Sequence, residues 1–328
     1  MTGPAGAIRV GVDIGGTFTD LQIYDGRVGR TVSHKTPTTP DDPSIGLVQG
    51  LKDAGQRFAF ALADISHILH GTTIATNAVL QRKFPKGALI TTRGFEDVLE
   101  IGRHARRDIY SVKPQRPDVL IPRNMRVGIA ERMRANGTVE TALNAAALDD
   151  LVATLGQQDI ATVAVALLNA YVNPTHEQAI AARLARDLPA LAVSISSDVS
   201  PEIREYERSN TTVLNALLMP VVKRYLDRLA ARFREENIAA RLLIVQSNGG
   251  VVSPATAARE PVRLLLSGPS GGALGARAIA RTLRIPDLVG VDMGGTSFDV
   301  SVVRDDRIEI ITQGEIDQLP VRVPMIEI

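Results

Sequence analysis

The sequence predicts a mixed α/β protein built from two domains. The chain has 328 residues, which is enough for two well-buried cores at roughly 150 residues per domain. Helix and strand patterns alternate through its middle, and one strand-turn-strand segment occurs twice. The composition is 45% hydrophobic and 22% charged, as in globular proteins, so a fibrous or disordered chain is excluded.

The repeated segment lies near the N-terminus and again near the C-terminus. Residues 11–20 (GVDIGGTFTD) and 290–299 (GVDMGGTSFD) are identical at seven of ten positions. The copies start 279 residues apart, too far for a solenoid repeat, so we interpret them as a duplicated structural element. Each copy predicts a three-stranded meander, with strands at 8–13, 18–24 and 28–34 in the first and at 288–292, 298–303 and 308–312 in the second.

Helices and strands are expected to alternate between the two copies. A basic, proline-rich arm is expected at 103–134, and we place a domain boundary near Val199, giving domains 1–198 and 199–328. A long helical region from Ser200 to about 237 is expected to be interrupted at Pro220. The other predicted helices are 41–56, 73–83, 145–155, 175–188 and 268–283, and the other predicted strands are a short one ending at His70, 88–92, 162–168, 192–196, 242–246 and 262–266.

Charge and residue usage exclude several functions. Lys and Arg number 37 against 36 Asp and Glu, a net charge of +1, so no global attraction to nucleic acid is expected. The absence of Cys excludes thiol nucleophiles and Cys-ligated metals, and the absence of Trp disfavours a base-stacking platform. With no secretory signal pattern and no long apolar run, we expect a cytoplasmic protein that does not contact membranes.

The repeated Asp-x-Gly-Gly-Thr motif carries groups that can hold phosphate. A Gly-Gly turn between strands exposes backbone N–H groups, the following Thr adds a hydroxyl, and the Asp can hold Mg²⁺, which bridges phosphate oxygens. We therefore expect two jaws that close on a triphosphate and Mg²⁺, with Asp13 and Asp292 as metal ligands. The jaws comprise Asp13, Gly15, Gly16, Thr17 and Thr19, and Asp292, Gly294, Gly295, Thr296 and Ser297.

The glycines are also compatible with other local structures. One copy alone is compatible with an ordinary hairpin, but its repetition favours a phosphate site. No Gly-x-Gly-x-x-Gly opens a helix, and no Gly-Lys-Ser/Thr of a P-loop occurs. His70, the turn at 248–250 and Arg103 stay open between structural roles and ligand binding.

The paired motifs resemble the two phosphate loops of the actin-like ATPase superfamily, whose fold is ribonuclease H-like with mixed sheets and flanking helices. Within it the chain resembles the hydantoinase/oxoprolinase family, which includes N-methylhydantoinase A, 5-oxoprolinase and the acetone carboxylase beta subunit. The matching segments, in order, are DIGGTFTD (13–20), HGTTIATN (70–77), TTRGFEDVLEIG (91–102), VSPEIREYE (199–207), QSNGG (246–250), SGPSGG (267–272) and DMGGTSFD (292–299).

This resemblance implies an ATP- and Mg²⁺-dependent hydrolase that opens a cyclic amide such as 5-oxoproline, a hydantoin or a lactam. Asp13, Asp292, Thr72 and Thr73 would be catalytic, and the glycines of the hinge, Gly268 and Gly271, would join the turns in binding the nucleotide. A hydantoinase B-type partner subunit or a fused C-terminal region is implied, within a homo- or hetero-oligomer.

Two alternatives remain: a ketone carboxylase subunit, and a nucleotide-dependent reactivase of a partner enzyme. A sugar kinase is disfavoured because the middle segments match the amidase family. Only 29 residues follow Asp299, so the resemblance implies a truncated second lobe and weak ATP binding by this chain alone.

Overall fold

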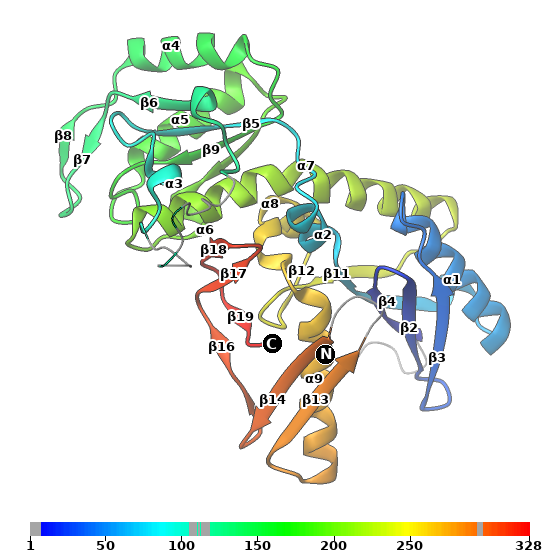
Figure 1. The fold of residues 1–328 in the computed structure, drawn as a ribbon. Coiled ribbons are helices and arrows are strands. Elements are labelled where there is room, and N and C mark those ends of the chain that lie inside the picture. Colours follow the sequence, from blue (N-terminus) through cyan, green and yellow to red (C-terminus); the bar gives the residue numbers. More distant parts are fainter. Residues whose placement is uncertain (1–7, 105–109, 111, 113–118, 294–297) are drawn as a thin grey trace. The chain divides into compact units, whose positions relative to one another are not determined.

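A computed structural model describes residues 8–104, 110, 112, 119–293 and 298–328, which form two compact units (Figure 1). Unit 1 combines Met1–Asn77, Val222–Thr312 and Pro324–Ile328, and unit 2 combines Ala78–Val221 and Gln313–Val323. Both units are therefore discontinuous in sequence. The predicted division into sequence domains near Val199 stays a prediction.

Unit 1 is built on a six-stranded mixed sheet with the order β12-β11-β4-β1-β2-β3. The β1–β2–β3 meander is antiparallel, whereas β4 runs parallel to β1 and to β11. Because β1 and β4 are parallel, their carboxyl ends lie side by side at the same end of the sheet. The strands are β1 (Ile8–Ile14), β2 (Phe18–Asp25), β3 (Arg30–Pro37), β4 (Ile65–Thr72), β11 (Arg241–Val245) and β12 (Val251–Val252).

Helix α1 (Pro43–Phe58) covers one face of this meander. It begins where predicted, because the Asp42 side chain accepts a hydrogen bond from the Ser44 backbone N–H and Pro43 supplies a preset helical φ. Leu47 and Leu51 are fully buried, and Gly50 allows the helix backbone to come close to the sheet. The predicted meander and the predicted helix after it are thus confirmed.

The second copy forms a separate sheet, β13-β14-β15, against helix α9 (Ser267–Leu283). Strands β13 (Leu288–Met293) and β14 (Phe298–Arg304) match the prediction, and left-handed residues Asp305 and Asp306 make the next turn. The third predicted strand, 308–312, is wrong. Only β15 (Arg307–Ile308) continues the meander, because the chain then leaves it and β16 (Ile310–Ile311) pairs with β19 (Met325–Ile326).

The remaining elements of unit 1 are short. The apolar run 262–266, predicted as a strand, instead forms the 3₁₀ turn η3. Pro261 favours a helical start there, and the Arg263 N–H donates to the Glu260 carbonyl (3.1 Å), which closes a turn rather than a strand ladder. These elements are η1 (Leu62–Asp64), α2 (Ile74–Leu80, which crosses into unit 2), α8 (Pro254–Arg259) and η3 (Pro261–Leu264).

Unit 2 contains a parallel four-stranded sheet with the order β10-β9-β5-β6. The two central strands, β9 and β5, are short runs buried on both faces, as in parallel sheets covered by helices. One face packs on α4 and α5 through residues such as Leu155 and Ile180, and the other packs on α7 through Leu217. The elements are β5 (Gly87–Thr92), β6 (Arg126–Ile129), α4 (Ala145–Gly156), β9 (Thr162–Ala166), α5 (Thr175–Asp187), β10 (Ala192–Ile195) and α6 (Ser196–Val199).

The described part of the arm predicted at 103–134 contains regular secondary structure. Strand β6 lies within it, and the Arg126 side chain is buried with its Nε donating to the Ile121 carbonyl (2.9 Å). The backbone pairing of β6 with β5, as the edge strand of the sheet, explains this difference. The remaining elements of unit 2 are α3 (Val98–Ile101), η2 (Arg123–Met125), β7 (Arg132–Met133), β8 (Val139–Thr141), β17 (Gly314–Ile316) and β18 (Leu319–Val321).

Helix α7 (Glu205–Glu235) is continuous through Pro220, so the predicted interruption is wrong. A proline inside a helix costs about 3 kcal/mol. Side chains on both sides of it, including Leu217 and Val222, are buried, and this burial offsets the missing hydrogen bond. None of the helices in the described parts of the chain is both long and apolar enough to cross a membrane.

Candidate nucleotide site

The two repeated segments form hairpins with the same strand register. Asp13 pairs with Asp20 across β1 and β2, and Asp292 pairs with Asp299 across β13 and β14. The pairing therefore repeats at the same offset as the sequence, and both hairpins lie in unit 1. The duplication seen in the sequence is a duplication of backbone geometry.

The first turn is fixed by Thr38, at the end of β3. Its backbone N–H donates to the Thr17 carbonyl (2.9 Å) and its hydroxyl donates to the Gly15 carbonyl (3.0 Å). The buried Thr19 hydroxyl lies 3.1 Å from that of Thr38 and therefore serves the turn rather than the open surface. Sequence reasoning missed Thr38, because it lies outside the motif.

The two glycines of this turn are not needed for a left-handed backbone, because neither is among the positive-φ residues. A Cβ atom at Gly15 would lie 3.2 Å from the Phe18 carbonyl oxygen, so Gly15 permits a tight turn. A Cβ atom at Gly16 would meet nothing within 4 Å. The backbone at Gly16 and the exposed Thr17 thus face open space that a ligand can occupy.

Asp13 lies where three chain segments converge. A Cβ atom at Gly71 would lie 3.4 Å from the Asp13 Oδ1, and a Cβ atom at Gly268 would lie 3.1 Å from it. Two backbones from distant parts of the sequence therefore approach this carboxylate with no side chain between. Thr73 belongs to the same convergence, because its Cγ2 would lie 3.9 Å from the Cβ atom at Gly268.

The pKa of Asp13 is raised from 3.8 to about 6. The main cause is desolvation by the surrounding protein, although one side of the residue stays accessible to solvent, and the carboxylates of Asp20 and Asp292 add repulsion. Asp20 is paired with Lys35 at 3.2 Å, whereas no ion pair links Asp13 to a cation in the described residues. The site therefore concentrates negative charge that a cation would relieve.

This donor set fits Mg²⁺. Among the described residues, no three His, Cys, Asp or Glu side chains gather into a protein-only metal site. Mg²⁺ does not require one, since it usually takes one or two carboxylates and completes its shell with water and phosphate oxygens. Asp13, together with the exposed Asp292, supplies oxygens of that kind.

Thr72 and Thr73 differ in burial and in their hydrogen-bond partners. Thr72 is 2% exposed, and its hydroxyl accepts from the Ile74 N–H (3.3 Å) at the start of α2. Thr73 donates its hydroxyl to the Ile14 carbonyl (3.1 Å), which ties the α2 entry to the end of β1. Only Thr73 is partly exposed beside Asp13.

The glycines of the hinge segment lie inside α9 rather than before it. Gly268 is in the first turn, beside Asp13, whereas a Cβ atom at Gly271 would meet nothing within 4 Å. The Ser267 hydroxyl donates to the Thr72 carbonyl (3.1 Å), and this bond holds the helix start against the β4–α2 connection. The structure thus brings Gly268 to the site and leaves Gly271 on the helix surface. The remaining predicted residues Gly294, Gly295, Thr296 and Ser297 lie outside the described residues.

Two further sequence candidates have structural roles. His70 is fully buried, its Nε2 lies 2.7 Å from the Tyr225 hydroxyl, and burial lowers its pKa to about 4, so it is neutral at pH 7. Gly249 adopts a left-handed φ of +78°, and the Gly250 N–H donates to Asn248 Oδ1 (2.9 Å). The His70 ring and the Asn248 side chain thus each have a hydrogen-bond partner within the protein.

Arg103 is held by Glu207 in unit 2. The Arg103 Nε and one terminal nitrogen each donate to the carboxylate at 2.7 Å. This pairing at the start of α7 explains a basic residue that the sequence left between a solvated arm and an anion site.

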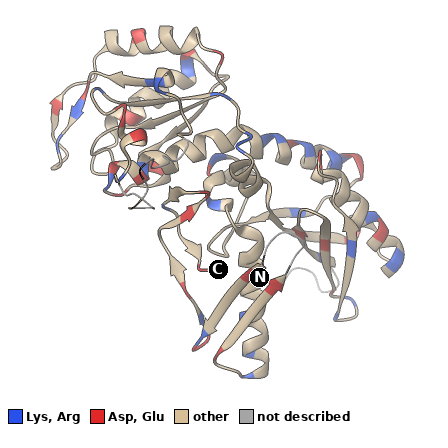
Figure 2. Ribbon diagram, viewed as in Figure 1, with Lys and Arg blue, Asp and Glu red and all other residues tan. Residues whose placement is uncertain are grey.

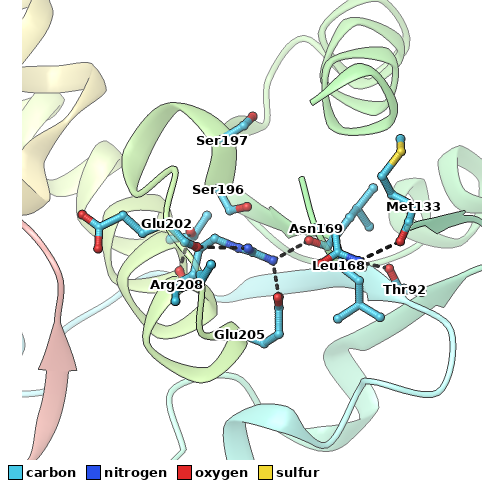
Figure 3. A network of polar contacts seen from close by, with 12 residues as sticks. Thr92, Met133, Leu168, Asn169, Ser196, Ser197, Glu202, Glu205 and Arg208 are labelled. Carbon is cyan, nitrogen blue, oxygen red and sulfur yellow. Dashed lines mark hydrogen bonds and ion pairs between the residues drawn. The ribbon is translucent and has the colours of Figure 1, made fainter. Parts of the chain in front are cut away.

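A buried polar network in unit 2 was missed by sequence reasoning (Figure 3). Arg208, fully buried, donates to the Leu167 carbonyl (2.6 Å) and pairs with Glu205. Buried Glu177 accepts from the Leu167 N–H (2.9 Å) and from the Ser196 hydroxyl (2.6 Å), and desolvation raises its pKa. These groups satisfy the loops after β9 and β10, and no signal in a single sequence separates them from surface charges.

The chain combines a mixed α/β fold, a duplicated hairpin, and two glycines, Gly71 and Gly268, that approach Asp13. Together these features define the class to which the protein belongs. The N-terminal region of the hydantoinase/oxoprolinase family matches residues 9–188, and the hydantoinase/oxoprolinase domain matches residues 208–328. The chain belongs to the hydantoinase/oxoprolinase family.

Similar proteins include the caprolactamase subunit alpha of Pseudomonas jessenii, 33% identical over 98% of this chain and 47% of that protein. The acetone carboxylase beta subunit of Xanthobacter autotrophicus is 29% identical over 99% of this chain and 48% of that protein. The 5-oxoprolinase 1 of Arabidopsis thaliana is 31% identical over 98% of this chain and 27% of that protein. The chain thus spans less than half the length of these relatives.

Two solved structures share the fold. An ATP-dependent caprolactamase from Pseudomonas jessenii matches with a TM-score of 0.88 and 33% identity, over 97% of this chain and 47% of that one. A nucleotide-free acetone carboxylase matches with a TM-score of 0.87 and 27% identity, over 98% and 47%. The expected fold of mixed sheets with flanking helices is confirmed, and it covers about half of each of these structures.

Proposed function

We propose that the protein binds the phosphates of Mg²⁺-ATP between its two hairpins and takes part in opening a cyclic amide. The observation that carries this proposal is the repeated register, in which Asp13 and Asp292 occupy the same place in two copies of one hairpin and are close enough to interact electrostatically. The similarity to caprolactamase and 5-oxoprolinase supports the substrate class.

The proposed reaction answers a chemical difficulty. A lactam carbonyl is a poor electrophile because nitrogen donates electrons into it. In the first step the carbonyl oxygen attacks the γ-phosphorus, the bond to the β-γ bridging oxygen breaks, and ADP leaves. Water then adds to the activated carbon, the carbon–nitrogen bond breaks so that the nitrogen leaves as an amine, and an acyl phosphate remains. A second water hydrolyses this acyl phosphate to a carboxylate and inorganic phosphate.

Residues of the first hairpin would position the nucleotide. The backbone at Gly16 and the Thr17 hydroxyl would contact phosphate oxygens, since both face open space, and Thr38 would keep the turn in place. Asp13 and Asp292 would hold Mg²⁺ or its waters, and the ion would neutralise charge on the β- and γ-phosphates. Thr73 and the start of α9 at Gly268 would border the γ-phosphate.

The complete activity would need polypeptide beyond this chain, either as a continuation or as a partner subunit. The relatives are more than twice as long, and several of them are named as subunits. We therefore propose that the isolated chain binds ATP weakly and that nucleotide binding tightens in the complete assembly.

The test is nucleotide turnover by the complete protein, isolated with the chains that co-purify. ADP and phosphate release would be measured with 5-oxoproline, hydantoin, N-methylhydantoin and caprolactam in turn. We expect ADP release to depend on one of these compounds and to fall by at least 100-fold in Asp13→Ala, while Gly271→Ala stays active. Turnover that is equal with and without every cyclic amide would refute the amide assignment.

A second candidate, ATP-dependent ketone carboxylation, is favoured by the structural match to acetone carboxylase. It would use the same phosphate site, because a ketone enolate oxygen can also be phosphorylated. Turnover that requires bicarbonate together with acetone or acetophenone, and that forms AMP, would assign the protein to this reaction. Turnover that requires only a partner enzyme, which regains activity, would indicate a reactivase.

A further inference from the structure

One face of the second hairpin is apolar and open to solvent. Its six side chains alternate along β13 and β14, and the strand register sets them opposite one another in pairs. Their exposed fractions run from 38% to 78%, whereas a Val or Phe side chain within a packed core is almost wholly buried. They are Val289, Val291, Met293, Phe298, Val300 and Val302, which we call the β13–β14 face.

The opposite face of the same strands is already packed. A Cβ atom at Gly290 would lie 3.1 Å from the Ala276 Cβ, and Ala276, Ala280 and Val303 form a buried cluster with α9. Figure 2 shows β13 and β14 uncharged along most of their length. A sheet normally buries a large apolar face, so this sheet lacks a covering layer on the β13–β14 face.

The first hairpin shows what that layer is. At the same offset that aligns the motifs, the β13–β14 face corresponds to Val10, Val12, Ile14, Thr19, Leu21 and Ile23. All six of these side chains are at most 4% exposed. Helix α1 covers them, with Leu47 and Leu51 fully buried and a Cβ atom at Gly50 only 2.8 Å from Leu21 Cδ1.

We propose that the β13–β14 face is the docking surface for an amphipathic helix with the residue pattern of α1, carried by polypeptide outside these 328 residues. Such a helix would present small residues and leucines one turn apart, as α1 does with Gly46, Leu47, Gly50 and Leu51. Polypeptide of sufficient length exists in the family, because this chain covers only 43–48% of several relatives. No described part of the present chain covers the face.

A synthetic helix gives a direct test. The probe is a peptide of residues 41–60, stapled between positions 49 and 53, whose side chains already contact each other on the outer surface of α1 (Gln49 Nε2 to Asp53 Oδ1, 2.7 Å). The staple is needed because an isolated helix of this length is marginal in water. Binding to the 328-residue chain is followed by calorimetry, and amide hydrogen exchange locates it.

We expect saturable binding that slows exchange within 288–304. Val291→Lys should weaken it at least tenfold, because the helix would then bury a charge. Val28→Lys, at a valine of the β2–β3 turn that is 71% exposed against 60% for Val291, should leave binding unchanged. Absence of binding at ~1 mM peptide would overturn the proposal, as would binding that ignores Val291→Lys. Self-association of the chain that Val291→Lys disperses would overturn it in favour of a second copy.

Discussion

Replacing Asp13 with Asn should stabilise the fold while removing its proposed metal ligand. The raised pKa of Asp13, about 6 against an ordinary 3.8, means that folding disfavours the ionised carboxylate. At about 1.4 kcal/mol per pH unit, the full difference corresponds to about 3 kcal/mol. Since one side of the carboxylate reaches solvent, screening reduces the expected gain to about 1 kcal/mol.

The pH dependence of the free energy of unfolding gives the sign of the Asp13 contribution. Between about pH 4 and 6 the folded protein binds more protons at Asp13 than the unfolded chain does, so this residue lowers stability as pH rises. The free energies of unfolding of wild type and Asp13→Asn, from urea titrations, should therefore coincide below pH 4 and separate in favour of the variant above pH 6. A variant that is less stable at pH 8, or a gap independent of pH, would refute this reasoning.

The other predictions combine the free energy of unfolding with nucleotide turnover or binding. Gly268→Ala should abolish nucleotide turnover, because its methyl group would lie against the Asp13 carboxylate. Gly271→Ala has open space around it and should stabilise the protein by about 0.5–1 kcal/mol. Thr38→Val should cost about 1 kcal/mol and weaken nucleotide binding, while Thr38→Ser should restore both. Tyr225→Phe should cost about 1–3 kcal/mol by leaving the buried imidazole of His70 unpaired, with turnover retained at low urea; an unchanged stability would show that this hydrogen bond contributes nothing.

The fold was predictable where one local pattern decided the outcome. The hairpins followed from apolar alternation and turn residues, and α1 followed from its Asp-Pro cap. Errors had two causes. Tertiary burial overrode local preference where α7 continues through Pro220, and the local helix-start signal of Pro261 was outweighed in the sequence by the apolar run that follows it, which turns instead of extending. The end of the second meander failed because β16 finds a partner, β19, that sequence spacing could not indicate.

The candidate site was predictable only in its motif residues. Asp13 and the turn glycines could be found because their motif is repeated in the sequence. The approach of Gly71 and Gly268 to Asp13 could not, since it depends on the parallel pairing of β1 and β4, which no periodicity specifies. Thr38 and Tyr225 act from elements distant in sequence. Their roles depend on contacts that exist only after folding.

The central claim is that the two hairpins act together on one Mg²⁺-nucleotide. A double-mutant cycle of Asp13→Asn and Asp292→Asn, with Mg²⁺-ATP binding to the complete protein measured by calorimetry, tests it most directly. We predict that each substitution alone weakens binding by at least tenfold, and that the double variant loses far less than the product of the two. Full additivity, or binding unchanged by Asp292→Asn, would contradict the account.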